Sequence, residues 1–358
     1  MDVGIIGGGV IGLLTALKLI DQGATVQVFD QPMSRPPASW AGGGILSPLF
    51  PWRYSAALTA LTMNAQRAYL ALDERLGQQH LPGLEVSPSG LLMPSVDDRP
   101  EAMRWAARQE IKLCMVDAGQ IEPRLSGEGA LWMPQVGHIR NPRLVAGLVR
   151  LLHQAGVFVE DQPVLAIERC QHGWRLQTPR GMVQAGRVLI SAGAWSAPLL
   201  APLGLRLPVI PVKGEMLLYP AAVPAPRCMI LRDSGYLIPR RDGRMLVGST
   251  VLPGVFDQRP SAAAYGQLES VARNLWPPLA GIEPEAHWAG LRPGSPRDCP
   301  FLSEVPGNPG LFIATGHYRN GLVCAPASAE IMAALIMGET PAIDPAPYSL
   351  SPSSSSPP

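Results

Sequence analysis

Residues 3–12, Val-Gly-Ile-Ile-Gly-Gly-Gly-Val-Ile-Gly, decide the fold. Gly7, Gly9 and Gly12 form a G-x-G-x-x-G pattern between an apolar run typical of a strand and an amphipathic helical pattern over 10–22. A second strand-like run ends in Asp30, eighteen positions after Gly12. In this strand–turn–helix–strand context the pattern is a dinucleotide-binding fingerprint.

Gly7 allows the tight turn, Gly9 lets backbone approach a pyrophosphate at the helix N-terminus, and Gly12 lets helix and strand pack closely. Asp30 would accept a hydrogen bond from a ribose hydroxyl. The fingerprint alone does not separate FAD from NAD.

The bulk composition narrows the class of protein. The chain has 358 residues, of which 47% are apolar and only 16% charged, and its net charge is +1. That balance and the lack of a basic stripe predict no nucleic-acid partner. The five cysteines are scattered and form no metal-binding pattern, which is typical of reduced thiols in a cytoplasmic protein. Lys18 and the glycines argue against a membrane segment at 3–20. The apolar composition is compatible with a homo-oligomer.

The order of predicted elements indicates an α/β fold with two domains. Helical patterns cover 55–76, 98–109, 142–154 and 327–337, and strand patterns crowd 157–191, 207–251 and 311–314. Asp242-Gly243 predicts a hairpin turn in the second of these blocks. We expect a Rossmann-like dinucleotide domain in three segments (1–50, 140–205 and 300–342). An inserted substrate domain, built on a large mixed or antiparallel sheet, takes 51–139 and 206–299. The Pro/Ser-rich tail, 343–358, is expected to be disordered.

Four further segments have the composition of a binding site. The glycine-rich stretch 38–48 is too apolar for a free linker and suits close approach to a cofactor. Arg292 lies among small and apolar residues, so it is either a clamp for a substrate carboxylate or a structural arginine paired with a distant acid such as Glu215. The turn 314–323 offers backbone N–H groups to an anionic ring edge. Tyr236 is either a substrate ligand or an ordinary sheet tyrosine.

These stretches together resemble the D-amino-acid-oxidase-type flavoproteins, most closely the glycine oxidases of the thiamine-biosynthesis type. The matching motifs run in family order from residue 3 to about 340: IIGGGVIG, SWAGGGILSP, QPVLAIE, LPVIPVKGEM, GYLIPRRDGRMLVGSTV, WAGLRPGSPRDCPFL and GHYRNGLVCAP. The resemblance implies an FAD domain with a substrate domain. It also implies that the expected homo-oligomer is a tetramer.

The resemblance also assigns residues. Arg292 would bind the substrate carboxylate, helped by Tyr236 and with Arg319 at the same end. The FAD-binding set comprises Gly7, Gly9, Val10, Ile11, Gly12, Asp30, Gln31, Ala38, Ser39, Gly43, Gly44, Ile45, Val164, His317, Tyr318, Arg319, Asn320, Gly321, Leu322 and Val323, with no metal. Sarcosine oxidases attach FAD to a cysteine upstream of the arginine loop. Here His287 and Trp288 precede that loop, so we expect non-covalent FAD.

The activity that follows is oxidation of glycine or another small amine by O₂, giving the imine or glyoxylate, ammonia and hydrogen peroxide, and supplying thiazole synthesis for thiamine. Alternatives are a sarcosine or D-amino-acid oxidase, and a dehydrogenase that passes electrons to a membrane quinone. A non-enzymatic flavin subunit and a NAD-dependent dehydrogenase are disfavoured, because each leaves Arg292, Arg319 or the GHYRNG turn without a role.

Overall fold

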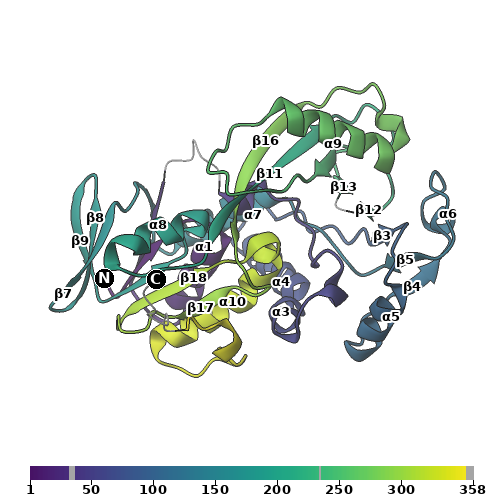
Figure 1. Cartoon of the computed structure of the whole chain (residues 1–358). Coiled ribbons are helices and arrows are strands. Elements are labelled where there is room, and N and C mark those ends of the chain that lie inside the picture. Colours follow the sequence, from purple (N-terminus) through teal and green to yellow (C-terminus); the bar gives the residue numbers. More distant parts are fainter. Residues whose placement is uncertain (32–36, 234, 352–358) are drawn as a thin grey trace, which may run out of the picture.

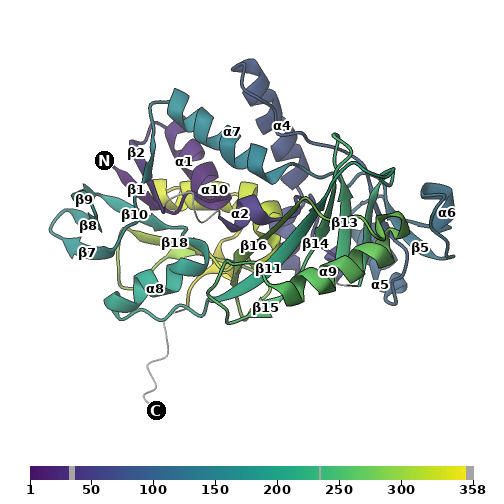
Figure 2. The same ribbon diagram turned by 90° about the horizontal axis from the view of Figure 1, so that it is seen from above.

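The computed structural model describes residues 1–31, 37–233 and 235–351. Its first large sheet has six strands in the order β17-β18-β10-β1-β2-β6. Figure 1 labels β17 and β18, and Figure 2 labels β18, β10, β1 and β2. All neighbours in it are parallel except β17, which pairs antiparallel with β18. The strands are β1 (Val3–Ile6), β2 (Val26–Asp30), β6 (Val159–Asp161), β10 (Arg187–Ile190), β17 (Phe301–Glu304) and β18 (Leu311–Thr315). This is the dinucleotide-binding architecture that the opening glycines predict.

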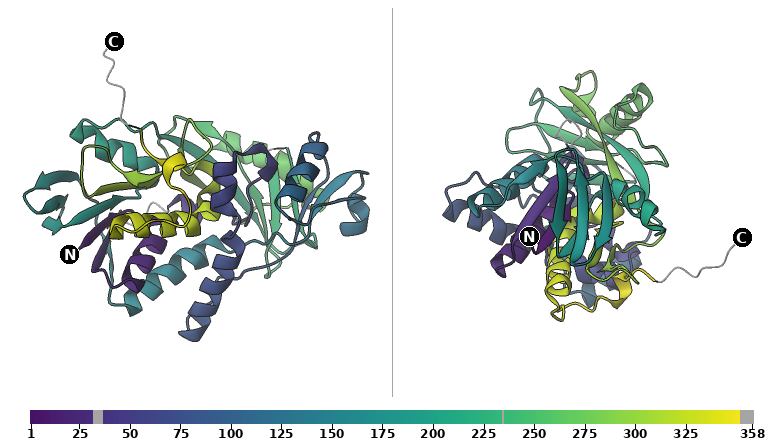
Figure 3. Two further views of the ribbon diagram at one scale, coloured as in Figure 1. Left: turned by 90° about the horizontal axis from the view of Figure 1, so that it is seen from below. Right: turned by 90° about the vertical axis from the view of Figure 1, so that its left-hand side faces the viewer.

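Apolar residues cover both faces of this sheet, as a parallel sheet requires. Val3, Ile5 and Leu189 pack against helices on one face, whereas Ile6 and Ile190 pack toward a smaller sheet on the other. The helices are α1 (Val10–Asp21), α7 (Asn141–Gln154) and α10 (Gly321–Met337), which lie side by side in Figure 3. The smaller sheet consists of β7 (Ala166–Cys170), β8 (Gly173–Thr178) and β9 (Gly181–Ala185), and α8 (Ser196–Leu200) follows β10.

The second large sheet has nine strands and lies at the other end of the molecule (Figure 2). Its order is β15-β11-β14-β13-β12-β3-β5-β4, with β16 also paired to β11. The expected hairpin at Asp242-Gly243 joins β13 to β14. The strands are β3 (Leu91–Met93), β4 (Cys114–Val116), β5 (Ala130–Met133), β11 (Ile210–Tyr219), β12 (Met229–Arg232), β13 (Gly235–Pro239), β14 (Met245–Gly248), β15 (Leu252–Pro253) and β16 (Ala286–Gly294).

Helices cover this sheet on both faces. Leu217 and Leu237 pack against α9 (Ala262–Leu275), and Met216 and Ile238 face a cluster that includes α5 (Arg99–Arg108). Two short helices, α2 (Ala38–Ala41) and α6 (Ala118–Ile121), complete the fold. The strands of the two large sheets interleave along the chain, which is compatible with the predicted discontinuous domains.

Three expectations about helices differ from the structure. The single helix expected at 55–76 is two helices, α3 (Ala56–Thr62) and α4 (Ala65–Gln78), because a turn at Met63 and Asn64 interrupts the helical structure. Helix α4 continues through Gly77 to Gln78, two residues beyond the expected end at 76. Helix α10 begins at Gly321, six residues before the expected start, and contains Pro326 in its interior, where the helix lacks the N–H that would otherwise bond to the Leu322 carbonyl.

The expectation of a wholly disordered tail is wrong for 343–351. Tyr348 is 1% exposed, and its hydroxyl donates to the Ala57 carbonyl over 2.7 Å. The Arg297 guanidinium donates to the carbonyls of Tyr348 and Ser349. A single buried aromatic ring anchors a segment whose overall composition is typical of disorder. Residues 352–358 lie outside the described residues.

Two further observations concern cysteines and membranes. All five cysteines are free thiols. The segment Tyr318–Met337 is long and apolar enough to cross a membrane, but 61% of its apolar window is buried inside the protein. Its position against α1 is that of a core helix.

Candidate active site

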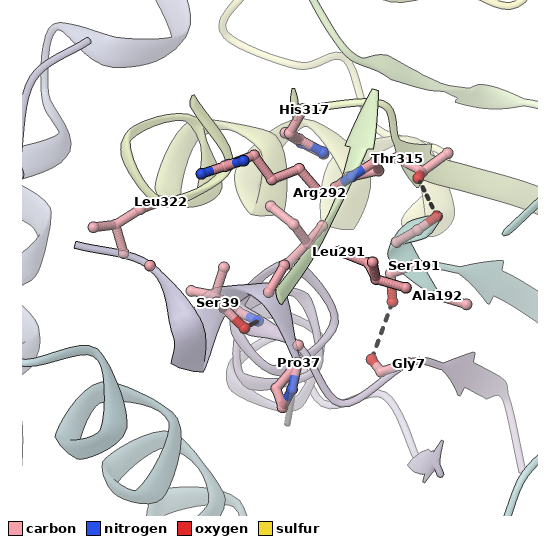
Figure 4. Close-up of a pocket in the computed structure, with 18 of the residues that line it drawn as sticks. Gly7, Pro37, Ser39, Ser191, Ala192, Leu291, Arg292, Thr315, His317 and Leu322 are labelled. Carbon is pink, nitrogen blue, oxygen red and sulfur yellow. Dashed lines mark hydrogen bonds between the residues drawn. The ribbon is translucent and has the colours of Figure 1, made fainter. Parts of the chain in front are cut away.

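A cavity of about 430 Å³ opens where the carboxyl ends of β1 and β2 meet strand β16 of the second sheet. The residues drawn around it come from distant parts of the chain. They belong to the opening fingerprint, the glycine-rich loop 38–48, the end of β10, strand β16 and the turn before α10 (Figure 4). Sites at the carboxyl ends of parallel strands are general in open α/β sheets.

The fingerprint glycines have separate roles. A Cβ on Gly12 would lie 2.0 Å from the Gly7 carbonyl oxygen, so only glycine permits this helix–strand contact. A Cβ on Gly9, by contrast, would meet only the Ser39 hydroxyl, at 3.5 Å, and Gly9 lines the cavity. The same hydroxyl accepts a hydrogen bond from the Val10 N–H at the first residue of α1. Gly9 therefore adds no side chain on the cavity side of this helix N-terminus, as close approach of a pyrophosphate requires, while the Val10 N–H is bonded to Ser39.

Asp30 ends β2 at the far side of the cavity, next to Gln31. Its carboxylate accepts the Gln31 N–H over 2.9 Å, and burial raises the pKa of Asp30 above its ordinary value. Val164 lies at the same end, buried and lining the cavity. This end has the acceptor and the apolar wall that a nucleoside needs.

Two hydroxyl residues that the motifs did not reveal hold the strand ends in place. The Ser191 hydroxyl, just after β10, lies 3.2 Å from the carbonyl oxygens of both Ile6 and Gly7. The Thr315 hydroxyl donates to the Gly193 carbonyl over 3.0 Å (Figure 4). Their only sequence signal is a small polar residue at the end of a predicted strand.

Arg292 lies in β16 and reaches into the cavity with no carboxylate partner among the described residues. Its guanidinium donates to the Thr250 carbonyl over 3.1 Å and to the Ser249 hydroxyl over 2.9 Å. Burial lowers the pKa of Arg292, and the nearby Arg319 cation lowers it further. A partly buried cation held only by neutral acceptors lacks a counter-ion, and this favours an anionic ligand.

Glu215, the acid considered as a partner for Arg292, is occupied elsewhere. Its carboxylate lies 3.2 Å from the Lys213 ammonium and accepts hydrogen bonds from the Ser261 N–H and hydroxyl, each over 2.9 Å. The structural alternative for Arg292 is therefore wrong as far as Glu215 is concerned.

Arg319 and Tyr236 border the same end of the cavity. One terminal nitrogen of Arg319, Nη2, is buried without a hydrogen-bond partner among the described residues. The buried Tyr236 hydroxyl has only the Met216 sulfur, 3.5 Å away, which is a weak acceptor. Both side chains have donor capacity to spare for a ligand.

His317 is a structural residue of the turn before α10. Its Nε2 lies 3.1 Å from the Ser328 hydroxyl, and complete burial lowers the pKa of His317 to about 3. The ring is therefore neutral at physiological pH and is not a proton donor to the cavity.

Most predicted site residues line the one cavity. The exceptions are Gly12, which packs beneath it, and Val323, which is buried in α10 and is not a lining residue. Lining residues to which the sequence analysis gave no role include Ser47, Leu49, Asn141, Pro163, Ser191, Trp195, Ser249, Leu291 and Thr315.

Comparison with known proteins places the chain in a family. The sequence profile described as "FAD dependent oxidoreductase" (DAO) matches residues 2–335. The glycine oxidase of Pseudomonas aeruginosa is 44% identical over 96% of this chain and 97% of its own length. The chain belongs to the glycine oxidase family of FAD-dependent oxidoreductases. It is therefore an FAD-dependent amine oxidase.

Solved structures agree with this family. Glycine oxidase from Geobacillus kaustophilus superposes with a TM-score of 0.92 at 32% identity, covering 98% of both chains. Iminodiacetate oxidase from Chelativorans sp. BNC1 gives a TM-score of 0.88 at 27% identity, covering 97% of this chain and 98% of its own.

The cavity of this family member fits FAD. It offers a helix N-terminus at one end, and at the other the partnerless Nη2 of Arg319 beside the side chains of Arg292 and Tyr236. The described lining residues include no cysteine, and the Cys299 thiol beyond the arginine loop contacts the Pro347 carbonyl instead. This donor set suits FAD held without a covalent bond.

Proposed function

We propose that this amine oxidase oxidises glycine, with sarcosine and small D-amino acids as slower substrates. The overall reaction would be glycine, O₂ and water giving glyoxylate, ammonia and hydrogen peroxide. The observation that carries the proposal is the partly buried Arg292 guanidinium, which lines the cavity with no acid partner among the described residues. A planar guanidinium binds a carboxylate through two parallel hydrogen bonds, which fixes orientation as well as affinity.

The residues present would bind and orient the substrate. Arg292 would hold the carboxylate, the Tyr236 hydroxyl would donate to the same group, and the unpaired nitrogen of Arg319 would add positive potential. Such orientation supplies much of the rate of an oxidation of this kind. FAD, when bound, accepts the hydride equivalent from the substrate and passes its two electrons to O₂.

No acid–base side chain is needed at the substrate end if the amine reacts in its neutral form. Asp30 is the one carboxylate among the described lining residues and lies at the nucleoside end, and His317 is held neutral by burial. This distribution favours hydride loss assisted by the amine lone pair over proton abstraction by a side chain.

The relatives support the same substrate class. Curated proteins 44% and 45% identical to this chain, from two Pseudomonas species, are glycine oxidases. A 31% identical relative from Synechocystis is a bifunctional ThiO/ThiG protein, so we assign the product to thiazole synthesis for thiamine. Five free thiols suit a cytoplasmic location, and we expect a homo-oligomer such as a tetramer. A dehydrogenase coupled to a membrane quinone is the less favoured alternative.

The test is a peroxide-release assay with glycine, sarcosine, D-alanine and D-proline, on wild type and Arg292→Met. We expect glycine to give the highest kcat/KM, and Arg292→Met to raise KM at least 100-fold with FAD still bound. Arg175→Met, an exposed site on β8, is the control and should behave as wild type. An Arg292→Met protein that loses FAD but keeps the wild-type KM would overturn the assignment.

A further inference from the structure

Strand β13 presents alternate residues to the glycine loop. Tyr236 and Ile238 face the same side of β13, and Arg240, the residue directly after the strand, continues that alternation. A Cβ on Gly43 would lie 2.8 Å from the Tyr236 ring and 3.0 Å from Ile238, and the Arg240 guanidinium donates to the Gly43 carbonyl over 2.8 Å. One strand face therefore fixes both the position and the orientation of Gly43.

Arg240 is 8% exposed and directs its donors to backbone. Besides Gly43, it donates to the Ile139 carbonyl over 2.9 Å and lies 3.1 Å from Nδ1 of His138. Burial lowers the pKa of His138 to about 3, so this ring is neutral. No ion pair in the described chain involves Arg240, whose pKa burial lowers to about 10, and the group stays charged at neutral pH. Burying a cation without a counter-ion costs folding free energy, so we expect the two carbonyls that Arg240 binds to have a role in the site.

The direction of two peptide groups follows from these bonds. The Gly43 carbonyl is turned to Arg240, and the Gly44 carbonyl accepts the Ile139 N–H over 2.9 Å. In a trans peptide the N–H points opposite to the carbonyl. The N–H groups of Gly44 and Ile45 are therefore turned away from Arg240 and Ile139, in residues that line the cavity.

We infer that Arg240 is a positioning residue that turns the N–H groups of residues 44 and 45 toward the flavin and ties this loop to the strand carrying Tyr236. The cofactor loop and the carboxylate site are thereby held in one register. The part that concerns FAD rests on the family assignment alone, and the part that concerns the carboxylate rests on the proposed function.

The test compares Arg240→Met and Arg240→Lys with Arg241→Met. Arg241 is the matched control because it is exposed and bonds to the Ser87 hydroxyl and the Val86 carbonyl, away from the loop. We expect the FAD Kd to rise at least tenfold in Arg240→Met and several-fold in Arg240→Lys, which retains one point donor for two carbonyls. Arg241→Met should match wild type. Saturated with FAD, Arg240→Met should also show a shifted visible flavin spectrum and a raised KM for glycine.

Several outcomes would decide the inference. An Arg240→Met protein with wild-type FAD Kd and flavin spectrum would overturn it, as would an equal loss in Arg241→Met. If Arg240→Met does not fold, Arg240→Lys decides: a wild-type Kd and spectrum overturn the role, and a weaker Kd with a shifted spectrum supports it. FAD affinity is measured without glycine. A wild-type enzyme that does not oxidise glycine would therefore refute the proposed substrate but not the role of Arg240 in FAD binding.

Discussion

Gly214→Ala is the sharpest perturbation of the proposed carboxylate clamp that leaves the arginine itself unchanged. Gly214 lies in β11, and a Cβ added there would lie 2.0 Å from Nη1 and 2.3 Å from Cζ of Arg292. The backbone of Gly214 does not have a positive φ, so alanine is not excluded by conformation. The guanidinium must move, and restoring an ordinary contact of 3.4 Å from 2.0 Å requires a shift of 1.4 Å.

That shift is large compared with the tolerance of the site. A shift of this size would break the hydrogen bonds from Arg292 to Ser249 and Thr250. A misplacement of a reacting group by about 1 Å can lower the rate roughly 100-fold. Losing one charged hydrogen bond costs about 1.5–3 kcal/mol. We therefore expect kcat/KM for glycine to fall roughly 10- to 150-fold, since about 1.4 kcal/mol is tenfold. The assay is peroxide release against glycine concentration, with FAD content measured in the same samples.

The control is Gly266→Ala, in α9, where an added Cβ meets no atom within 4 Å. Alanine is the better helix former by about 0.5–1 kcal/mol, so this variant should be fully active and slightly more stable. A Gly214→Ala enzyme with wild-type KM and kcat for glycine would refute the claim that Arg292 holds the carboxylate at this place.

Three further changes test other parts of the account. Tyr236→Phe should raise KM for glycine about threefold to tenfold, with little change in FAD affinity, because it removes one donor to the carboxylate; an unchanged KM would make Tyr236 an ordinary sheet residue. The pKa of His317 is lowered to about 3 from an ordinary 6.5, so its stabilisation is complete above pH 6.5 and is lost as pH falls toward 3. His317→Gln should flatten the slope of unfolding free energy against pH by up to about 1.4 kcal/mol per unit, and an identical slope would contradict the burial. Tyr348→Phe should lower the unfolding free energy by about 0.5–1.5 kcal/mol, because it removes the hydrogen bond from the buried ring to the Ala57 carbonyl; a chemical denaturation curve equal to wild type would show that the segment is not held by this bond.

The parts of the fold that local pattern specifies were predictable from sequence. The fingerprint glycines and Asp30 have fixed spacing around a strand, a turn and a helix, so the site end of the first sheet followed directly. The hairpin of β13 and β14 followed from Asp242-Gly243. Arg292 could be singled out from sequence as a cation in an apolar run. Whether Glu215 is its partner could not be decided, because Val212, only three residues from Glu215 along β11, pairs with Arg292.

What the sequence left open depends on contacts between distant segments. Gly214 and Ser249 matter only because β11 and the end of β14 meet Arg292 in space. Arg240 has no local signal that distinguishes it from Arg241. The burial of Tyr348 depends on α3, almost three hundred residues earlier in the chain, and composition cannot report that contact.

The central claim is that this FAD enzyme takes hydride from a small amino acid held by Arg292. An anaerobic titration of the purified, FAD-loaded protein with glycine tests it most directly. We expect glycine to bleach the flavin absorbance, and air to restore it with release of hydrogen peroxide. A flavin that stays oxidised with glycine, sarcosine and D-alanine alike would contradict the proposed substrate class.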